Sequence, residues 1–143
     1  MKVNQKIKKV SFIGMGLINS SLARDLKIKK FYLSSSAYSR RLSTINKIKK
    51  LNLVDFASSN IEKTIKEADI IIVGIPVAAY QEVFKKICNN IKPGAIITDV
   101  GSVKKEVINS VKKYLPKNID FVPGHPIAGT ENSGPESGFA GLF

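Results

Sequence analysis

Three features of the sequence predict an α/β fold, with a doubly wound, mostly parallel sheet and helices on both of its faces. A short apolar run over residues 10–13 leads into Gly14 and Gly16, and apolar residues at helical spacing follow directly. Residues 69–75 are almost continuously apolar and β-branched, as expected of a strand buried on both faces. Strand patterns alternate with helical patterns, which is typical of parallel strands joined by right-handed crossovers. Together these features indicate a Rossmann-type fold.

In the first half of the chain, a helix over residues 17–29 follows the glycines, because apolar residues recur there at helical spacing. Ser59 and Glu62 are spaced as a capping box, which predicts a brief helix ending at Ala68. The other elements predicted here are a strand over 31–38, a helix over 42–51 and a short strand over 54–57.

In the second half, Pro76 ends the buried strand, and a helix over 78–90 with one apolar stripe follows it. The other elements predicted here are a strand over 95–100, a helix over 105–115 and a last short strand over 119–122. Residues 124–143 differ, because they are rich in glycine, proline and serine and show almost no helical periodicity.

The length and the cysteine content indicate one domain, residues 1–143, in a reducing compartment. A chain of 143 residues can bury a sufficient core without disulfides or metals. The single cysteine, Cys88, excludes a disulfide framework and is expected to be a small core residue. Lys2 and Lys6 precede an apolar run that is too short for a signal peptide or a membrane span. We therefore expect a cytoplasmic protein with no membrane partner.

The net charge of +12 is carried mainly by dispersed lysines. Lysine accounts for 20 of the 23 basic residues, often in pairs such as Lys85-Lys86 and Lys112-Lys113. Such pairs on polar helix faces are typical of solvated surface. A nucleic-acid-binding protein would be expected to gather arginine and aromatic residues along one groove. We therefore expect no nucleic-acid partner, although the charge favours anionic ligands.

Gly14 and Gly16 form the phosphate-facing part of a dinucleotide-binding fingerprint. The strand, turn and helix around them aim backbone N–H groups and the positive end of a helix at a pyrophosphate. We therefore expect Gly14, Gly16, Leu17 and Ile18 to bind the cofactor. The third glycine of the fingerprint, which packs the helix against the strand, is replaced by Asn19.

Ser39, Arg40 and Arg41 favour NADP over NAD as the cofactor. In NAD-binding folds an acidic residue at the end of the second strand, about 20 residues past the glycines, binds the ribose hydroxyls. Here Ser39 takes that place, and two arginines follow it. A hydroxyl and a guanidinium can hold a 2′-phosphate, which a carboxylate would repel. The alternative is that both arginines simply begin the next helix and face water, with NAD as the cofactor.

Ligands of such sheets bind beyond the carboxyl ends of the strands, and Pro76, Gly101, Ser102 and His125 all lie at predicted strand ends. We therefore expect Pro76 and Gly101 to bind the cofactor as well. Histidine transfers protons near neutral pH, so His125, the only histidine, is a candidate general base. Two plainer interpretations stay open, in which His125 is structural and Ser102 is only a helix N-cap. One histidine, one cysteine and scattered carboxylates do not suggest a metal site.

Two segments of the chain carry a resemblance to a known family. They are residues 99–104, Asp-Val-Gly-Ser-Val-Lys, and residues 124–135, Gly-His-Pro-Ile-Ala-Gly-Thr-Glu-Asn-Ser-Gly-Pro. With them, residues 10–143 resemble the prephenate/arogenate (cyclohexadienyl) dehydrogenases of tyrosine biosynthesis. The part that matches is the dinucleotide-binding domain of that family.

The resemblance implies an NAD(P)-dependent oxidative decarboxylation of prephenate or arogenate, with hydride passing from the ring carbon that bears the hydroxyl to the nicotinamide. His125 matches the family histidine that hydrogen-bonds this hydroxyl and takes its proton, and Ser102 matches the serine that helps to orient the pair. Thr130 and Glu131 fall in the loop that borders the substrate entrance in relatives. The residues agree with this chemistry, because hydride loss from an alcohol carbon requires a base of near-neutral pKa.

The chain departs from the family pattern in two ways. Asn19-Ser20-Ser21 stands where the family usually has Gly-Gly-Ser. Relatives also continue into a helical domain that makes the dimer and supplies an arginine for a substrate carboxylate, whereas this chain ends at Phe143. We therefore expect a homodimer only together with that domain, and weak nucleotide binding with little or no turnover by this chain alone.

Three other functions are alternatives to this one: a non-catalytic nucleotide-binding module, a basic nucleic-acid-binding domain, and another Rossmann-type dehydrogenase such as a hydroxyacid dehydrogenase. Normal activity after His125→Ala would favour the first. Steep salt dependence of binding to duplex DNA would favour the second. The third fits residues 124–135 less well than the tyrosine-pathway family does.

Overall fold

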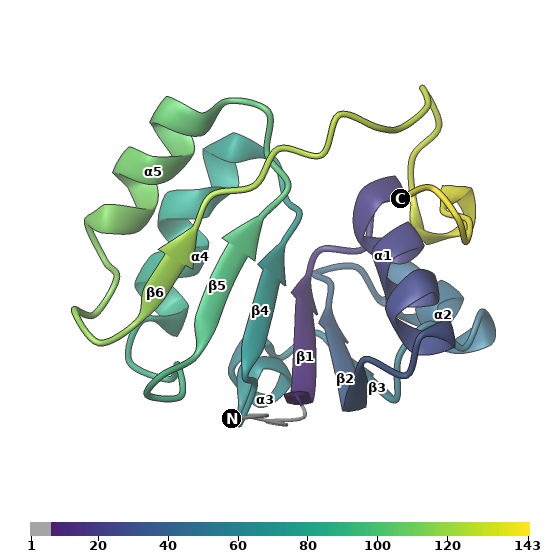
Figure 1. The fold of residues 1–143 in the computed structure, drawn as a ribbon, viewed down its shortest axis with the longest axis horizontal. Coiled ribbons are helices and arrows are strands. Elements are labelled where there is room, and N and C mark those ends of the chain that lie inside the picture. The colour runs from purple at the N-terminus through teal and green to yellow at the C-terminus, as the bar shows by residue number, and fades with distance from the viewer. Residues whose placement is uncertain (1–6) are drawn as a thin grey trace, which may run out of the picture.

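The computed structural model describes residues 7–143, which form one sheet with helices on both of its faces (Figure 1). The predicted Rossmann-type fold is therefore confirmed. Lys2 and Lys6, on which the expectation of no signal peptide partly depends, lie outside the described residues.

All neighbouring strands in the six-stranded sheet run parallel. The strands are β1 (Ile7–Ile13), β2 (Tyr32–Tyr38), β3 (Phe56–Ser58), β4 (Ile70–Val73), β5 (Ile96–Asp99) and β6 (Asp120–Val122). Their order in the sheet is β3-β2-β1-β4-β5-β6, so the chain builds outward from β1 in one direction and then in the other. The order reverses between β1 and β4, and ligands of open α/β sheets bind at such a point.

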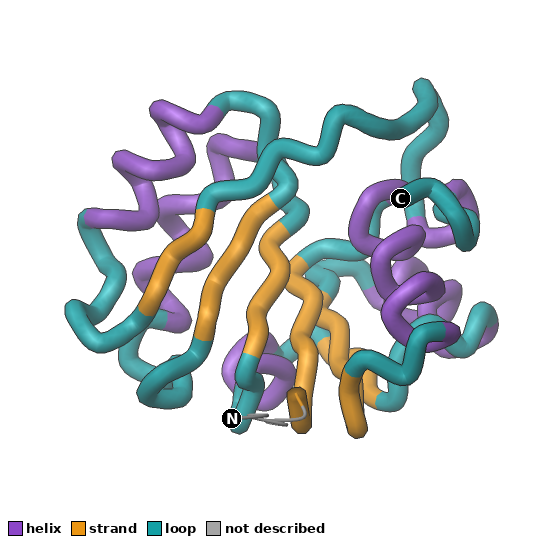
Figure 2. Tube along the Cα trace, viewed as in Figure 1, coloured by secondary structure: helices purple, strands orange, loops and turns teal. Residues whose placement is uncertain are grey.

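Each crossover in the described part of the chain contains a helix, as the alternating patterns predict (Figure 2). The α-helices are α1 (Leu17–Ile28), α2 (Leu42–Lys50), α3 (Ile61–Ile65), α4 (Tyr80–Ile87) and α5 (Lys104–Lys112). Two single 3-10 turns complete the set, η1 (Val77–Ala79) and η2 (Pro135–Ser137). The predicted helix over 78–90 therefore begins as the 3-10 turn η1 and ends earlier, at Ile87.

The sheet separates two hydrophobic cores. On one face, Val10 and Phe12 of β1 pack with residues of α1 and α2, including Ala23 and Ile48. On the other face, Ile13 of β1 belongs to the core formed with α3, α4 and α5. Successive residues of a strand point to opposite faces, so β1 must be apolar on both. This arrangement explains why β4, which pairs with β1 at the centre of the sheet, has the continuously apolar sequence Ile-Ile-Ile-Val.

The predictions for α3 and for Cys88 are wrong. Helix α3 ends at Ile65 and not at Ala68. Asn60, not Ser59, caps α3, and its side chain accepts the Lys63 amide at 2.8 Å. Asparagine caps helices as well as serine does, and a start at Ile61 places both Ile61 and Ile65 in the core. Cys88 is only partly buried, because it lies just past the end of α4 and beside its apolar stripe.

After β6, residues 123–134 run across the carboxyl end of the sheet, and the chain then packs against α1 and α2 (Figure 1). We call residues 133–141 the C-terminal strap. The amide of Phe139 donates to Ser21 Oγ at 3.1 Å, and the amide of Gly141 donates to Asp25 Oδ1 at 2.7 Å. Lys47 of α2 pairs with Glu136 at 2.5 Å. The irregular end of the chain thus packs on the helices of the first two crossovers.

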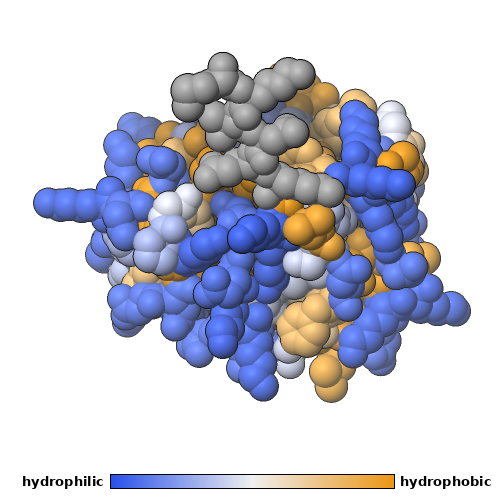
Figure 3. All heavy atoms as spheres, turned by 60° about the horizontal axis from the view of Figure 1, so that its bottom comes forward, coloured by the Kyte–Doolittle hydropathy of each residue, from blue (hydrophilic) through white to orange (hydrophobic). Residues whose placement is uncertain are grey.

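Hydrophilic side chains cover much of the visible face where the strands begin, with smaller hydrophobic areas between them (Figure 3). This distribution agrees with lysines spread over the surface. Within residues 7–143, no helix combines the length and the apolar character that crossing a membrane requires.

Candidate functional site

The turn between β1 and α1 has the backbone geometry that the glycines predict. Gly14 has a φ of +85°, and a Cβ atom there would lie 2.3 Å from the carbonyl oxygen of Gly74. Gly16 is the N-cap of α1, and no side chain caps that helix end. Around Gly16 no described atom beyond its chain neighbours lies within 4 Å of where a Cβ would be. The start of α1 is therefore left open for an anionic group.

A cavity of about 380 Å³ lies beyond the carboxyl ends of β1, β2 and β4. It is lined by six of the residues that the sequence predicts to bind a cofactor: Gly14, Gly16, Ser39, Arg40, Arg41 and Pro76. The strap also contributes to its wall, through Ser133, Gly134 and Pro135. Residues far apart in the sequence thus meet at the point where the strand order reverses.

The same cavity is lined by Glu82 and Lys86 of α4, which the sequence pattern does not mark as binding residues. Their side chains form an ion pair at 2.7 Å. The hydrogen bond between them lowers the pKa of Glu82 and raises the pKa of Lys86, and the charge of Arg40 acts on both groups. The spacing of four residues predicts this pair on a helix. It does not predict that the pair lines a cavity, since this depends on how α4 packs on the sheet.

A smaller cavity of about 200 Å³ lies on the other side of the glycine turn and shares Gly16 and Gly74 with the first. Leu17 and Ile18 of α1 line it together with Thr130, so the predicted cofactor residues of α1 meet the predicted substrate loop. Glu131 and Gly101 line neither cavity.

Asn19 also lines this smaller cavity, at the position of the missing third glycine. It is 1% exposed, and its side-chain amide donates to the carbonyl oxygens of Gly14 at 2.8 Å and Ile72 at 3.4 Å. A Cβ atom on Gly74 would lie 2.6 Å from the Asn19 Nδ2 atom. The close packing of helix on strand is therefore kept, because Gly74 of the neighbouring loop is the small residue.

Ser102 and His125 are both exposed and follow the adjacent strands β5 and β6. Thr98 pairs with Val122, so Ser102 lies four residues and His125 three residues beyond that pair. Neither residue lines the two cavities. The N-cap of α5 is Val103, without a side-chain cap, so the interpretation of Ser102 as an N-cap is wrong.

Asp99 lies at the end of β5 and was not singled out in the sequence, although it begins the first resemblance segment. It is 1% exposed, and its carboxylate pairs with Lys104 and accepts the Tyr80 hydroxyl at 3.4 Å. Burial, and then the charge of Asp99, raise the pKa of Tyr80 well above its ordinary value. Tyr80 is therefore neutral, and its hydroxyl donates to this carboxylate and to the carbonyl oxygen of Val73, which lies 3.3 Å away. Among residues 7–143, no group of three histidine, cysteine or acidic side chains could hold a metal ion.

Comparisons of the sequence with known proteins agree with one another. Residues 22–143 match the family described as prephenate dehydrogenase, nucleotide-binding domain. A cyclohexadienyl dehydrogenase from Zymomonas mobilis is 40% identical over 136 residues, which is 95% of this chain and 46% of that protein. A prephenate dehydrogenase from Lactococcus lactis is 35% identical over 140 residues, which is 96% of this chain and 39% of that protein.

Solved structures give the same result. A prephenate dehydrogenase from A. aeolicus, in complex with hydroxyphenyl propionate and NAD+, has a TM-score of 0.84 at 29% identity, over 95% of this chain and 47% of that chain. An arogenate dehydrogenase from Synechocystis has a TM-score of 0.83 at 32% identity, over 94% of this chain and 46% of that chain. This chain spans less than half the length of each of these relatives. The chain belongs to the prephenate dehydrogenase family and corresponds to its nucleotide-binding domain.

Proposed function

We propose that this chain binds NADP and forms the cofactor-binding domain of a cytoplasmic enzyme that oxidatively decarboxylates prephenate or arogenate. One observation carries the proposal: the cavity of about 380 Å³ joins the glycine turn to Ser39, Arg40 and Arg41. The names of the relatives support the reaction class. The single cysteine and the sequence pattern support the compartment.

The residues present fit a dinucleotide. The open space around Gly16 and the uncapped start of α1 offer backbone N–H groups to a pyrophosphate. A side chain at Gly14 would collide with Gly74, and one at Gly16 would fill the space that a phosphate needs. The cavity volume is within the range of small-molecule sites, roughly 300–1,000 Å³.

The cations at the cavity favour a 2′-phosphate. Arg40, Arg41 and Lys86 all line it, while Glu82 is paired with Lys86. The Ser39 hydroxyl accepts the Arg41 amide at 3.3 Å, which holds the serine beside the start of α2. The second candidate cofactor is NAD, because the structure of the A. aeolicus prephenate dehydrogenase contains NAD+.

In the proposed reaction, a bound nicotinamide cofactor would supply the acceptor for the hydride that leaves the ring carbon bearing the hydroxyl. His125 takes the hydroxyl proton and Ser102 helps to orient this pair, while Thr130 and Glu131 border the substrate entrance. A base in hydrogen-bond contact with the hydroxyl lowers the barrier, because the proton leaves as hydride is lost. Loss of carbon dioxide then makes the ring aromatic. The rest of the domain holds the reactants together and limits the access of water.

We propose in addition that residues 1–143 are one domain of an enzyme whose substrate-binding and dimerising part is a separate helical domain. The 143-residue chain alone is then expected to turn over little or no prephenate and to form no stable dimer. Turnover assays and sedimentation measurements on this chain test that expectation. Near-normal turnover would contradict it.

The cofactor proposal is tested by titrating NADPH and NADH separately against the chain, with Arg40→Ala/Arg41→Ala as the variant. Removing both guanidinium groups is expected to weaken NADPH binding by about tenfold or more, with a much smaller effect on NADH. Lys49→Ala/Lys50→Ala is the matched control, because it removes the same charge from exposed positions of α2 outside the cavity. Equal binding of both nucleotides, unchanged in the variant, would show that the preference for NADP is wrong.

The catalytic proposal is tested by His125→Ala in the enzyme that carries this domain. A general base contributes typically 10²–10⁴-fold, so kcat is expected to fall by about that factor while cofactor binding is retained. Unchanged turnover would instead favour a non-catalytic nucleotide-binding module.

A further inference from the structure

The carboxylate of Asp99 connects two segments that the chain separates by more than twenty residues. One oxygen, Oδ2, accepts the Gly101 amide at 2.9 Å. The other, Oδ1, accepts the Gly124 amide at 3.1 Å. Gly101 directly precedes Ser102, and Gly124 directly precedes His125. A single side chain, 0% exposed, thus anchors the backbone beside both candidate catalytic residues.

Lys104, in the first turn of α5, also binds Asp99 and the second segment. We call Asp99 and Lys104 together the anchor. Its ammonium donates to Asp99 Oδ2 and also to the carbonyl oxygen of Gly124. Both backbone polar groups of Gly124 are therefore bound, the N–H by Asp99 and the C=O by Lys104. A Cβ atom on Gly124 would lie 2.5 Å from the carbonyl oxygen of Asp99, so the close approach of the two loops requires glycine.

We propose that the Asp99–Lys104 pair is a positioning unit that fixes His125 relative to Ser102. This inference rests on the proposed function, in which His125 takes the proton of the substrate hydroxyl. The imidazole itself is exposed, so side-chain packing contributes little to fixing its position. The backbone at Gly124 must therefore hold it, and a misplacement of about 1 Å can cost about 10²-fold in rate.

The chemistry of the anchor requires a carboxylate. Asp99 accepts from two amides, one ammonium and one hydroxyl, using both of its oxygens. An asparagine has one acceptor oxygen, and its NH₂ group would face a donor. Asp99→Asn therefore leaves at least one of the Gly101 and Gly124 amides without an acceptor while changing the volume very little.

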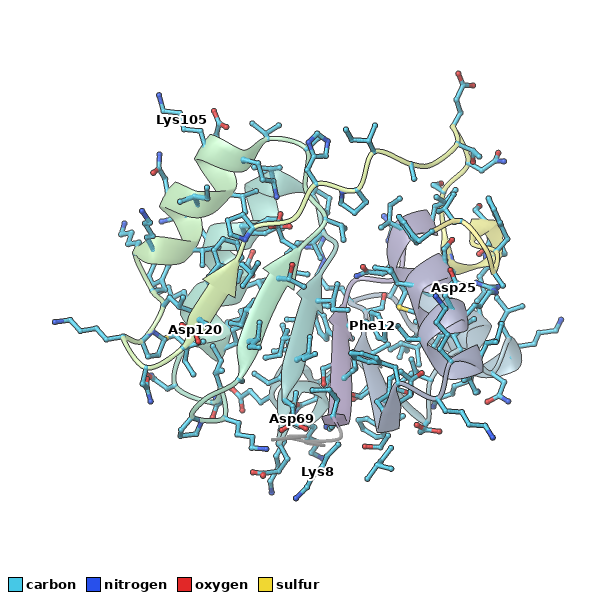
Figure 4. All side chains as sticks on the ribbon, viewed as in Figure 1. Lys8, Phe12, Asp25, Asp69, Lys105 and Asp120 are labelled. Atoms are coloured by element: carbon cyan, nitrogen blue, oxygen red, sulfur yellow. The ribbon has the colours of Figure 1, made fainter. Side chains whose placement is uncertain are left out.

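The first test measures backbone order in the 143-residue chain by NMR. In Asp99→Asn, the amides of Gly101 and Gly124 are expected to exchange with solvent at least about tenfold faster, and the His125 amide to lose order, relative to Phe12 of β1. The ring signals of His125 are unambiguous because it is the only histidine. Asp120→Asn is the matched control, since Asp120 is exposed at the start of β6 (Figure 4). Equal acceleration at Phe12, or no change beyond the control, would overturn the proposal.

The second test measures kinetics in the enzyme that carries this domain. Asp99→Asn is expected to lower kcat roughly 100-fold while the KM for the nucleotide changes less than about threefold, because neither cavity includes Asp99. Gly124→Ala serves if Asp99→Asn does not fold, since it displaces the same loop without removing a charge. A parallel loss of kcat and nucleotide affinity in both variants would show a merely structural role. His125→Ala separates the two proposals: if it leaves turnover normal, the proposed function fails, whereas the NMR result on the anchor is unaffected.

Discussion

The side-chain amide of Asn19 donates to the carbonyl oxygen of Gly14 at 2.8 Å. Asn19, which replaces the third glycine of the fingerprint, therefore stabilises the turn at Gly14, the first glycine. A second donation, to Ile72 at 3.4 Å, connects α1 to β4 across the point where the strand order reverses. The altered fingerprint therefore keeps both of its structural roles. The Asn19 side chain holds the backbone turn, and the space around Gly16 stays open.

We expect Asn19→Ala to lower the free energy of unfolding by about 1–2 kcal/mol, because one partly buried and one buried hydrogen bond are lost. Asn19→Asp should cost more, about 3 kcal/mol or more, since a buried carboxylate would then face two carbonyl oxygens. Urea unfolding followed by circular dichroism measures both values. Equal stability of the two variants would contradict this account of Asn19.

The contact between the C-terminal strap and α1 requires glycine at position 138. A Cβ atom on Gly138 would lie 2.0 Å from Ser20 Oγ and 2.8 Å from the Ser21 amide. Gly138→Ala is therefore expected to release the strap from α1 and to make residues 133–141 sensitive to limited proteolysis. The free energy of unfolding should fall by about 1–3 kcal/mol, as for other overpacked sites.

A double-mutant cycle tests the cause of this effect. Ser20→Ala removes the closest of the colliding atoms, so it should restore part of the protease resistance in the Gly138→Ala background. Ala140→Ser is a suitable control, because it enlarges an exposed residue of the same segment. Strictly additive effects of the two substitutions would argue against the Ser20–Gly138 contact as the reason.

Asp69 makes the stability of the fold depend on pH. It directly precedes β4, at the end of the sheet where the strands begin, and Figure 4 shows it near Lys8. It accepts the amides of Lys8 at 2.8 Å and Lys9 at 3.0 Å, and its other oxygen pairs with Lys92 at 2.5 Å. Burial acts to raise the pKa of Asp69, but these hydrogen bonds outweigh it and hold the pKa below its ordinary value of 3.8. A depressed pKa in the folded state means that the ionised group stabilises the fold.

That stabilisation is present above pH 3.8 and is lost as the pH falls through the lower pKa of the folded state. Asp69→Asn is therefore expected to unfold more easily than the parent protein at pH 7, by about 1–2 kcal/mol, with a difference that shrinks below pH 3.8. Chemical unfolding at several pH values measures it, with Asp120→Asn as the control for charge. A difference that is constant from pH 7 to pH 3 would contradict the assignment to Asp69.

We expect Lys86 and Glu82 to affect how strongly the chain prefers NADPH over NADH. Lys86→Ala is expected to weaken NADPH binding by about threefold to tenfold, whereas Glu82→Gln should strengthen it, because it releases Lys86 from its partner. Lys85→Ala is the matched control, since Lys85 is exposed on the same helix and does not line the cavity. Fluorescence titration measures the effects. Equal responses of NADPH and NADH to these variants would show that α4 does not contact the 2′-phosphate.

Much of the fold could be predicted from the sequence because its signals are local. A continuous apolar run specifies a strand buried on both faces, as in β4, and Gly14 marks a turn that requires a positive φ. The same locality explains the errors. Asn60 and Ser59 are both good caps, so the local pattern does not distinguish them, and in the structure Asn60 caps α3.

By itself, then, the sequence determined the order of strands and helices, the glycine turn and the strand ends at which a ligand could bind. The tertiary structure alone decided which distant residues share a site. It brought Lys86 to the cavity of Arg40 and Arg41, and it placed Asp99 between the amides of Gly101 and Gly124. The physical reason is that periodicity reports only which side of an element is buried, whereas the partner of a buried polar group is set by how the elements pack.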